Sequence, residues 1–204
     1  MLYIFDEMNK LDDDIPESMK SMLSDERLEK IHKLRSPLNK KVSVVAYLLL
    51  RLALLEGYCI NEAVEFEYAK KGKPLLKKYP HIHFNISHSK NTAACVVSDV
   101  EVGVDVQNIA PVADAVAKRV LTSDEYNSFK SSPVPDEYFC EVWTIKESFL
   151  KKTGRGLTTK LGNLPAKEVK DRMIYKGIDY ICCVCGPDMK IKHIRREDFE
   201  QLRN

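Results

Sequence analysis

The strongest constraint on the fold is an order of elements that occurs twice along the chain. Ser24-Asp-Glu and Ser123-Asp-Glu, 99 positions apart, each combine a cap residue with early acids, which is typical of a helix start. At the same offset Gly57 falls on Gly156. Each half reads as a helix, a longer helix and then strands, which predicts a duplicated unit of about half the chain. Ligand sites commonly lie in the cleft between such units.

Hydrophobic periodicity places the main elements. Apolar residues recur at helical spacing from Val42 to Leu55, with Gly57 as the expected C-cap. A second long helix is expected from Asp136 to Lys152, stopping near Gly154. Shorter helices are expected over 113–120 and 123–130 and at the C-terminus. The expected strands cover residues 64–68, 82–86, 93–98, 102–106, 180–185 and 190–194.

Composition excludes several classes of function. Among 204 residues, 32 Lys and Arg face 30 Asp and Glu, so the net charge of +2 gives no general case for nucleic-acid binding. The most apolar stretch, Val42 to Leu55, is interrupted by Arg51 and is shorter than the roughly 18 residues of a membrane span. The N-terminal residues have neither the basic region nor the apolar region of a secretory signal. We therefore expect neither a nucleic acid nor a membrane as partner.

The six cysteines predict a reduced, cytoplasmic protein. Their spacing does not form the disulfide framework of a small secreted domain, and a chain of this length does not need one. Cys182 and Cys185 form a single C-x-x-C with no second ligand pair at a spacing that suits zinc. In the apolar run Tyr180–Cys185 the thiols are expected to behave as small hydrophobic groups.

One acid lies inside an apolar strand. In Val102-Gly-Val-Asp-Val-Gln107, strand alternation points Asp105 away from Val104 and Val106. Two interpretations stay open at this point: a solvent-facing residue at a strand edge, or a ligand for a hard cation displayed from a rigid strand.

A second acid lies on the long helix of the second half. Trp143, Glu147 and Lys151 are spaced i, i+4 and i+8, so they share one helix face. The simple interpretation is a surface Glu–Lys pair worth a few tenths of a kcal/mol. Because the chain's single tryptophan favours burial, the stripe is also consistent with one that leaves the core near Glu147, where an acid would line a cleft.

Two further segments suit anions. The strand Phe84-Asn-Ile-Ser-His-Ser89 ends in hydroxyls and an imidazole, groups that suit phosphate oxygens. A nucleophilic Ser87–His88 couple is disfavoured because adjacent strand residues point to opposite faces, and no G-x-S-x-G elbow is present. The turn Lys70-Lys-Gly-Lys-Pro74 is either a solvated loop or an anion-binding turn, in which Gly72 would allow the backbone to approach the anion closely.

Four of these motifs, in this order, resemble the 4′-phosphopantetheinyl transferases of the surfactin-synthetase-activating type. The motifs are Gly72-Lys-Pro74, Phe84-Asn-Ile-Ser-His-Ser89, Gly103-Val-Asp105 and Trp143-x-x-Lys146-Glu147-Ser148-x-x-Lys151. The resemblance spans residues 24–157 and implies a Mg²⁺-dependent enzyme. Its reaction would move 4′-phosphopantetheine from coenzyme A to a serine of an apo acyl or peptidyl carrier protein, leaving adenosine 3′,5′-bisphosphate.

The resemblance also implies a fold and an assembly. The fold class is α+β, a pseudo-twofold pair of similar α+β halves with the active site in the cleft between them. Residues 1–101 would form the N-terminal half with coenzyme A contacts, and residues 102–204 the C-terminal half with the metal ligands and the catalytic helix. A two-half chain of this kind completes its site as a monomer.

The family's motifs assign roles to individual residues. Asp105 and Glu147 would hold Mg²⁺, or Mn²⁺, against the coenzyme A diphosphate. Gln107 stands where many relatives have a third acid, and its amide oxygen can ligate without supplying a charge. Glu147 is the expected base, directly or through water, and Lys151 would stabilise or protonate the leaving phosphate. The implied coenzyme A contacts are Arg27, Lys30, Ser43, Lys73, Ser87, His88, Lys146 and Lys151.

Two other functions remain as alternatives. The absence of the third acid is also consistent with a catalytically impaired coenzyme A or nucleotide-binding module. The same set of Asp, Glu and His side chains is also consistent with a metal-dependent phosphohydrolase. The residues do not indicate whether a fatty-acid, polyketide or peptide carrier is modified.

Overall fold

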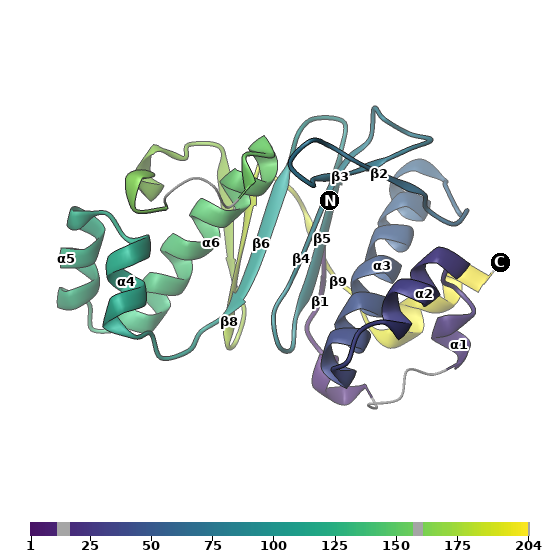
Figure 1. The fold of residues 1–204 in the computed structure, drawn as a ribbon, viewed down its shortest axis with the longest axis horizontal. Helices are drawn as coiled ribbons and strands as arrows, with labels where there is room; N and C mark the ends of the chain where they lie inside the picture. Colours follow the sequence, from purple (N-terminus) through teal and green to yellow (C-terminus); the bar gives the residue numbers. More distant parts are fainter. Residues whose placement is uncertain (12–16, 157–160, 204) are drawn as a thin grey trace.

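A computed structural model describes residues 1–11, 17–156 and 161–203, arranged as two α+β halves side by side (Figure 1). The first half has a four-stranded sheet in the order β4-β5-β1-β9, and the second has a three-stranded sheet in the order β6-β8-β7. No described helix has the length and apolar character that crossing a membrane requires.

The elements of the first half precede residue 101, apart from the last strand and the C-terminal 3₁₀ helix. Its strands are β1 (Leu2–Phe5), β2 (Phe66–Tyr68), β3 (Pro74–Leu76), β4 (His83–His88), β5 (Ala93–Ser98) and β9 (Ile191–His193). Its helices are α1 (Glu17–Lys20), α2 (Asp25–His32) and α3 (Pro37–Tyr58), with 3₁₀ helices η1 (Met8–Lys10) and η5 (Arg196–Arg203).

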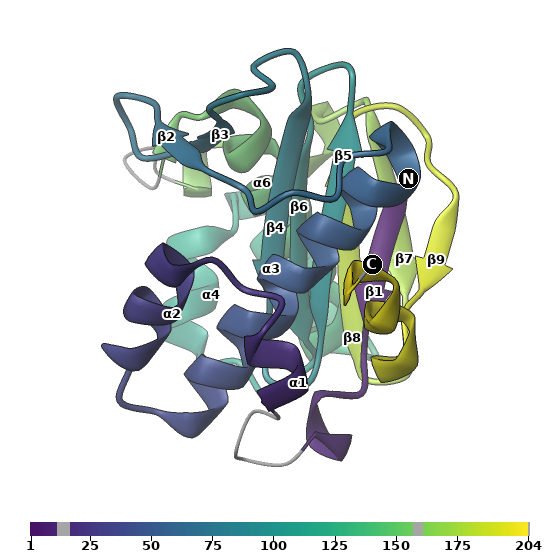
Figure 2. The same cartoon turned by 90° about the vertical axis from the view of Figure 1, so that its right-hand side faces the viewer.

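The second half is built around one long helix. Its strands are β6 (Gly103–Asn108), β7 (Arg172–Lys176) and β8 (Tyr180–Cys185). Its helices are α4 (Asp114–Val120), α5 (Ser123–Ser131) and α6 (Pro135–Thr153), with 3₁₀ helices η3 (Leu161–Asn163) and η4 (Ala166–Glu168). Helix α6 lies across β6 and β8, much as α3 lies across the first sheet (Figures 1 and 2).

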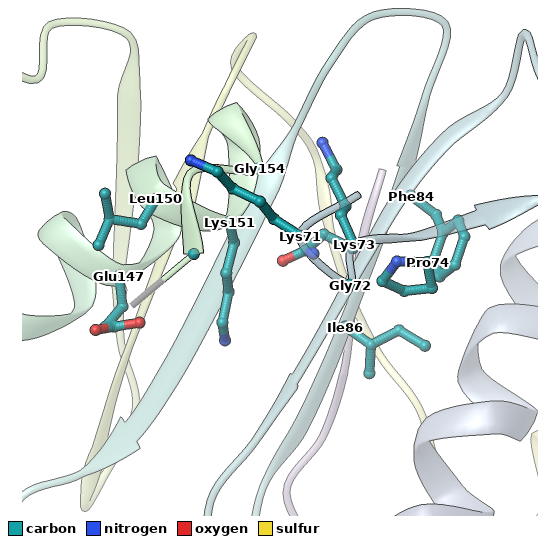
Figure 3. Close-up of a pocket in the computed structure, with 12 residues that line it drawn as sticks. Lys71, Gly72, Lys73, Pro74, Phe84, Ile86, Glu147, Leu150, Lys151 and Gly154 are labelled. Carbon is teal, nitrogen blue, oxygen red and sulfur yellow. The ribbon is translucent and has the colours of Figure 1, made fainter. Parts of the chain in front are cut away.

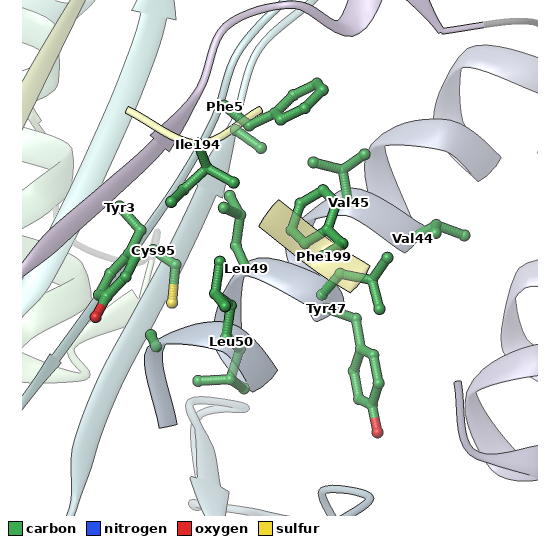
Figure 4. Packing of buried hydrophobic residues seen from close by; sticks show 14 of the residues in the cluster. Tyr3, Phe5, Val44, Val45, Tyr47, Leu49, Leu50, Cys95, Ile194 and Phe199 are labelled. Carbon is green, nitrogen blue, oxygen red and sulfur yellow. The ribbon is translucent and has the colours of Figure 1, made fainter. Parts of the chain in front are cut away.

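Three apolar cores hold this arrangement. In the first half, Leu49 and Leu50 of α3 pack against Tyr3 and Cys95 of the sheet (Figure 4). A second core lies between α6 and its own sheet. The third lies between the two sheets, where residues of β1 and β5 meet Val104, Val106 and Val184. The halves therefore share an apolar interface.

The C-terminal residues return to the first half. Strand β9 pairs in parallel with β1, and Phe199 of η5 stacks on Phe5 with ring centroids 5.9 Å apart. The expected division into 1–101 and 102–204 puts these residues in the second half, whereas the structure packs them on the first. The physical reason is that β5 pairs with only one edge of β1. Pairing with β9 satisfies the backbone groups on the other edge of β1, which would otherwise be exposed.

The predicted helices have different ends from those expected. The helix expected from Val42 begins at Pro37, with Ser36 as its cap, and Gly57 lies inside it. The left-handed C-cap is Cys59, with φ 56°, so Gly57 as C-cap is wrong, and its match to Gly156 is not a structural equivalence. The cap of α5 is Thr122, one residue before the expected Ser123.

Gly103 is required by close packing of β6 on α6. A methyl group at this position would overlap the carbonyl oxygen of Ser148 and the backbone nitrogen of Lys152. Gly103→Ala should therefore lower the free energy of unfolding by about 2–3 kcal/mol, measured by urea denaturation. Gly57→Ala is the control, because its site in α3 is open and alanine should stabilise the helix by up to about 1 kcal/mol. Equal stability of Gly103→Ala and wild type would contradict this packing.

The thiols differ in access. Cys59 is exposed and the other five cysteines are buried and unpaired. Burial raises the pKa of Cys140 to about 12, so its reactive thiolate is scarce at neutral pH. We expect iodoacetamide to label Cys59 alone in the native protein and all six thiols after denaturation, as counted by intact-mass spectrometry. Rapid native labelling of a second cysteine would contradict the packing of β5, α6 or β8.

Candidate active site

A cavity of about 350 Å³ lies where the two halves meet (Figure 3). The first half contributes the turn Lys71–Pro74 before β3 and the apolar side chains of Phe84 and Ile86 on β4. The second half contributes the end of α6, including Glu147 and Lys151. Residues of three of the four motifs that carry the family resemblance therefore line one cavity, and Asp105 of the fourth motif adjoins it through its bond to Lys151.

The halves are joined beside this cavity by side chains of β4. Alternate residues of this strand accept hydrogen bonds from alternate backbone N–H groups of β6, at 2.8, 3.2 and 3.0 Å. The three bonds run from Val104, Val106 and Asn108 to Asn85, Ser87 and Ser89. This seam is a finding of the structure, since the sequence predicted phosphate contacts for the hydroxyl groups of this segment and no role for Asn85.

Asp105 lies on β6, facing α6, and is only 6% exposed. Its Oδ1 atom accepts hydrogen bonds from Ser87 Oγ at 2.8 Å and from Lys151 Nζ at 2.6 Å, while its buried Oδ2 atom has no partner among the described residues. Burial raises the pKa of this carboxyl, and the bonds to Lys151 and Ser87 oppose that rise. The direction predicted from strand alternation is confirmed, because Val104 and Val106 point into the core between the sheets.

Glu147 lies on α6, lines the cavity and is 7% exposed. Its Oε1 atom is buried without a partner in the described part of the chain. Burial raises the pKa of this carboxyl, the negative charge of Asp105 adds to the rise, and Lys151 opposes it. Glu147 lines the cavity, as the stripe predicted for an acid at this position. The burial along the stripe differs from the expected order, because Trp143 is half-buried against Phe139 whereas Glu147 is buried.

The two carboxylates fit a divalent cation. Each has one buried oxygen without a partner, and such an oxygen is costly unless a cation or donor reaches it. Hard cations such as Mg²⁺ take oxygen ligands and often bind one or two carboxylates plus phosphate oxygens. Across the residues described, no three Asp, Glu, His or Cys side chains gather as a metal cluster. Gln107 is exposed at the end of β6. Any cation here would therefore take further oxygens from substrate or water.

The cations at the cavity are positioned by hydrogen bonds between the halves. Lys151 Nζ bonds Asp105 and Ser87, which leaves one of its three N–H groups for a ligand. Lys73 Nζ donates to the carbonyl oxygen of Lys152 at 2.7 Å, and burial lowers its pKa. At the end of β4, desolvation and then the Lys151 charge lower the pKa of His88.

Three of the implied coenzyme A contacts, Arg27, Lys30 and Ser43, lie together but outside this cavity. Arg27 Nη2 donates to the backbone and side-chain oxygens of Ser43, at 3.0 and 2.8 Å. Lys30 Nζ donates to Glu26 at 2.7 Å and to the Tyr68 hydroxyl at 3.3 Å. Because Tyr68 is opposite Pro74 across the β2–β3 pair, this cluster adjoins the basic turn of the cavity.

Lys146, another implied contact, also lies away from the cavity. Its side chain has no exposure, and Nζ donates to Glu125 at 2.6 Å and to the carbonyl oxygens of Val120 and Leu161. Successive helix residues are rotated by about 100°, so Lys146 faces α5 whereas Glu147 faces the cavity. Lys146 therefore has a structural role and is not one of the proposed substrate contacts.

Comparison with known proteins identifies the family. The chain is 32% identical over 158 residues to the 4′-phosphopantetheinyl transferase psf-1 of Bacillus pumilus, covering 76% of this chain and 68% of that protein. The chain belongs to the 4′-phosphopantetheinyl transferase family. Residues 101–175 match the model of the 4′-phosphopantetheinyl transferase superfamily.

Other members of the family show similar coverage. The transferase Sfp of Bacillus subtilis (strain 168) is 27% identical over 78% of this chain and 72% of its own. HetI of Nostoc sp. is 33% identical over 71% of this chain and 66% of its own. A solved holo-[acyl-carrier-protein] synthase from Thermotoga maritima aligns with a TM-score of 0.31 and 18% identity, over 42% of this chain and 61% of that one. A score this low supports no structural argument.

Proposed function

We propose that this 4′-phosphopantetheinyl transferase moves the phosphopantetheine group of coenzyme A to a serine of an apo acyl or peptidyl carrier protein. The observation that carries the proposal is the pair of unpartnered, buried carboxylate oxygens of Asp105 and Glu147, of which Glu147 lines one cavity together with the basic turn Lys71–Pro74. A diphosphate with its cation matches this arrangement of charge. We also propose that the protein acts as a cytoplasmic monomer, with neither nucleic acid nor membrane as partner.

Asp105 and Glu147 would hold Mg²⁺ or Mn²⁺, and further oxygens would come from substrate, from water and from the Gln107 amide at the exposed edge of the site. When bound, the cation would neutralise charge on the coenzyme A diphosphate. This resembles other phosphoryl-type transfers, in which positioning and charge stabilisation dominate catalysis. The unpartnered oxygens supply the charge that such a cation requires, and Gln107 would add an oxygen without adding charge.

The protein's own groups account for the proton and the leaving group. The carrier serine oxygen attacks the β-phosphorus of coenzyme A, and the bond from that phosphorus to the bridging oxygen breaks. Glu147 accepts the serine proton, directly or through water, because it has a buried oxygen without a protein partner. Lys151 directs its remaining N–H group at the phosphate of the departing adenosine 3′,5′-bisphosphate.

The remaining contacts would orient coenzyme A. Lys73 and His88 flank the cavity beside Lys151, and Arg27, Lys30 and Ser43 form the adjoining cluster for the 3′-phosphate. Desolvation of Arg27 lowers its pKa, which is the ordinary cost of holding a guanidinium ready for an anion. Ser87 and Lys146, which the resemblance also implies, have their polar groups bonded within the protein.

Intact-mass spectrometry tests the proposal. An apo carrier protein incubated with this protein, coenzyme A and Mg²⁺ should gain one phosphopantetheine group, and EDTA should prevent the gain. Tight coenzyme A binding with no gain on any class of carrier would favour the impaired binding module instead. Hydrolysis of coenzyme A or a nucleotide without a carrier would favour the phosphohydrolase.

The carrier is expected to dock through charge. Lys151, Lys152 and Arg155 lie at the end of α6 beside the cavity, and they suit an acidic helix of the partner. Raising the ionic strength from about 0.05 to about 0.5 M should raise the KM for carrier severalfold, and more than the KM for coenzyme A, because exposed pairs are screened more than those in a cavity. Steady-state kinetics at both salt concentrations measure this. An equal change in the two KM values would contradict docking through these cations.

A further inference from the structure

We infer that Ser87 is a positioning residue that orients the Asp105 carboxylate, and not a contact for coenzyme A. A serine hydroxyl has one proton to donate and two lone pairs to accept. Ser87 Oγ donates to Asp105 Oδ1 and accepts from Lys151 Nζ, both at 2.8 Å, and accepts from the Val106 N–H at 3.2 Å. The protein thus uses the full bonding capacity of this hydroxyl, and Ser87 is buried.

The bonds at Ser87 determine which oxygen of Asp105 is available. Ser87 and Lys151 both bond Oδ1, so the carboxylate cannot rotate without breaking two hydrogen bonds, one of them an ion pair. Oδ2 is left without a partner, as is Oε1 of Glu147. Ser87 therefore sets the orientation in which two bare oxygens, from β6 and α6, are presented for a cation.

Ser87 also ties the acidic side of the site to the first half. It belongs to β4, whereas Asp105 and Lys151 belong to β6 and α6. Phe84 and Ile86, on the same strand, line the cavity together with the basic turn. One hydroxyl thus sets the position of the carboxylate relative to the wall against which the substrate would lie. This step rests on the proposed function, since it assumes that the carboxylates hold a cation.

Ser89 provides a matched control two residues along the same strand. Its hydroxyl accepts the N–H of Asn108 at 3.0 Å, which is the same kind of seam bond as the one between Ser87 and Val106. Within the described residues its hydroxyl bonds neither Asp105 nor Lys151. Ser89→Ala therefore removes a seam bond alone, and Ser87→Ala removes a seam bond together with the positioning of the carboxylate.

The test measures cation binding in the free protein and transfer in parallel. Titration with Mn²⁺, followed by electron paramagnetic resonance without coenzyme A, should show Ser87→Ala weakening the Kd about 10- to 100-fold, the usual range for residues that orient metal ligands. In the transfer assay the half-saturating Mg²⁺ concentration should rise similarly, while the KM for coenzyme A at saturating Mg²⁺ stays within about twofold. Ser87→Thr keeps the hydroxyl and should restore most of the Mn²⁺ affinity, and Ser89→Ala should leave it unchanged.

Two outcomes would overturn the inference. A raised KM for coenzyme A with unchanged Mn²⁺ affinity in Ser87→Ala would make Ser87 a direct substrate contact. Equal effects of Ser87→Ala and Ser89→Ala on Mn²⁺ affinity, with equal losses in melting temperature, would show that Ser87 contributes only a structural hydrogen bond between the two halves. Because the Mn²⁺ titration needs no carrier, its result is distinct from a failure of the transfer reaction itself.

Discussion

Glu147→Gln is expected to lower kcat/KM for transfer about a thousandfold while the protein stays folded. The change keeps the size of the side chain but removes a negative charge from a carboxylate whose Oε1 atom is buried without a partner. Loss of one preorganised electrostatic group in a dry site commonly costs a factor of about 10²–10³, and here the group is also the proposed base. The transfer assay with saturating Mg²⁺ measures the loss.

The same variant should be more stable than wild type in the absence of metal. Burial and Asp105 raise the pKa of Glu147 in the folded state, so its ionised form opposes folding at pH values above that pKa. Glutamine removes this cost, and the melting temperature in EDTA near neutral pH should rise by about 2–4 °C. At acidic pH, where Glu147 is protonated in both states, the difference should vanish.

Glu141→Gln is the control on the same helix. Glu141 pairs with Lys176 at 2.9 Å, is partly exposed and lies outside the cavity lining. This variant should change transfer and stability little. Near-normal turnover by Glu147→Gln would refute its assignment as ligand and base, whereas lost transfer with reduced stability would indicate a structural role.

Lys146→Met is expected to lower the free energy of unfolding by about 3–5 kcal/mol without raising the KM for coenzyme A. Lys146 Nζ is fully buried and bonds the Glu125 carboxylate and two carbonyl oxygens. Removing Lys146 leaves the Glu125 carboxylate with its two backbone N–H donors but without its cation, and it takes one donor from each carbonyl oxygen. Chemical denaturation measures the stability, and kinetics below the melting temperature measure the KM.

Lys176→Met is the matched control, because Lys176 pairs with Glu137 and Glu141 while its side chain is 53% exposed. Exposed pairs contribute about 0–1 kcal/mol, so this variant should resemble wild type. If Lys146→Met kept its stability but raised the KM for coenzyme A, the diphosphate contact implied by the resemblance would hold and the buried position of Lys146 would not.

Local sequence pattern was sufficient for most elements and for the outline of the site. Strands 93–98 and 180–185 have the ends that alternation and apolar runs predicted. The helices expected over 123–130 and 136–152 are present within one residue at each end. The motifs also identified Asp105, Glu147 and Lys151; Glu147 and Lys151 line the cavity, and Asp105 bonds Lys151. Such features follow from neighbouring residues, because side-chain period and capping are local properties.

Strands β1 and β7 were not predicted, because their stability comes from partners far away in the chain; β3, which has only three residues, was not predicted either. β1 lies between β5 and β9, so all four of its residues are buried and no alternation appears. β7 pairs only with β8, and its residues are mostly half-buried, which leaves no clear period. Pairing across long sequence separations determines both strands, and no local window contains that information.

Residue types and their spacing were enough to predict the family, most of the elements and the candidate residues of the site. How neighbouring polar residues divide their roles depends on the packing of segments that are distant in the chain. Lys146 and Glu147 are adjacent, yet α5 supplies Glu125 for one and β6 supplies Asp105 for the other. Likewise, Ser87 and Ser89 look alike in the strand, and only the approach of β6 and α6 gives Ser87 the carboxylate and the ammonium. A polar side chain's role depends on which partners surround it, and those partners are set by the packing of distant segments.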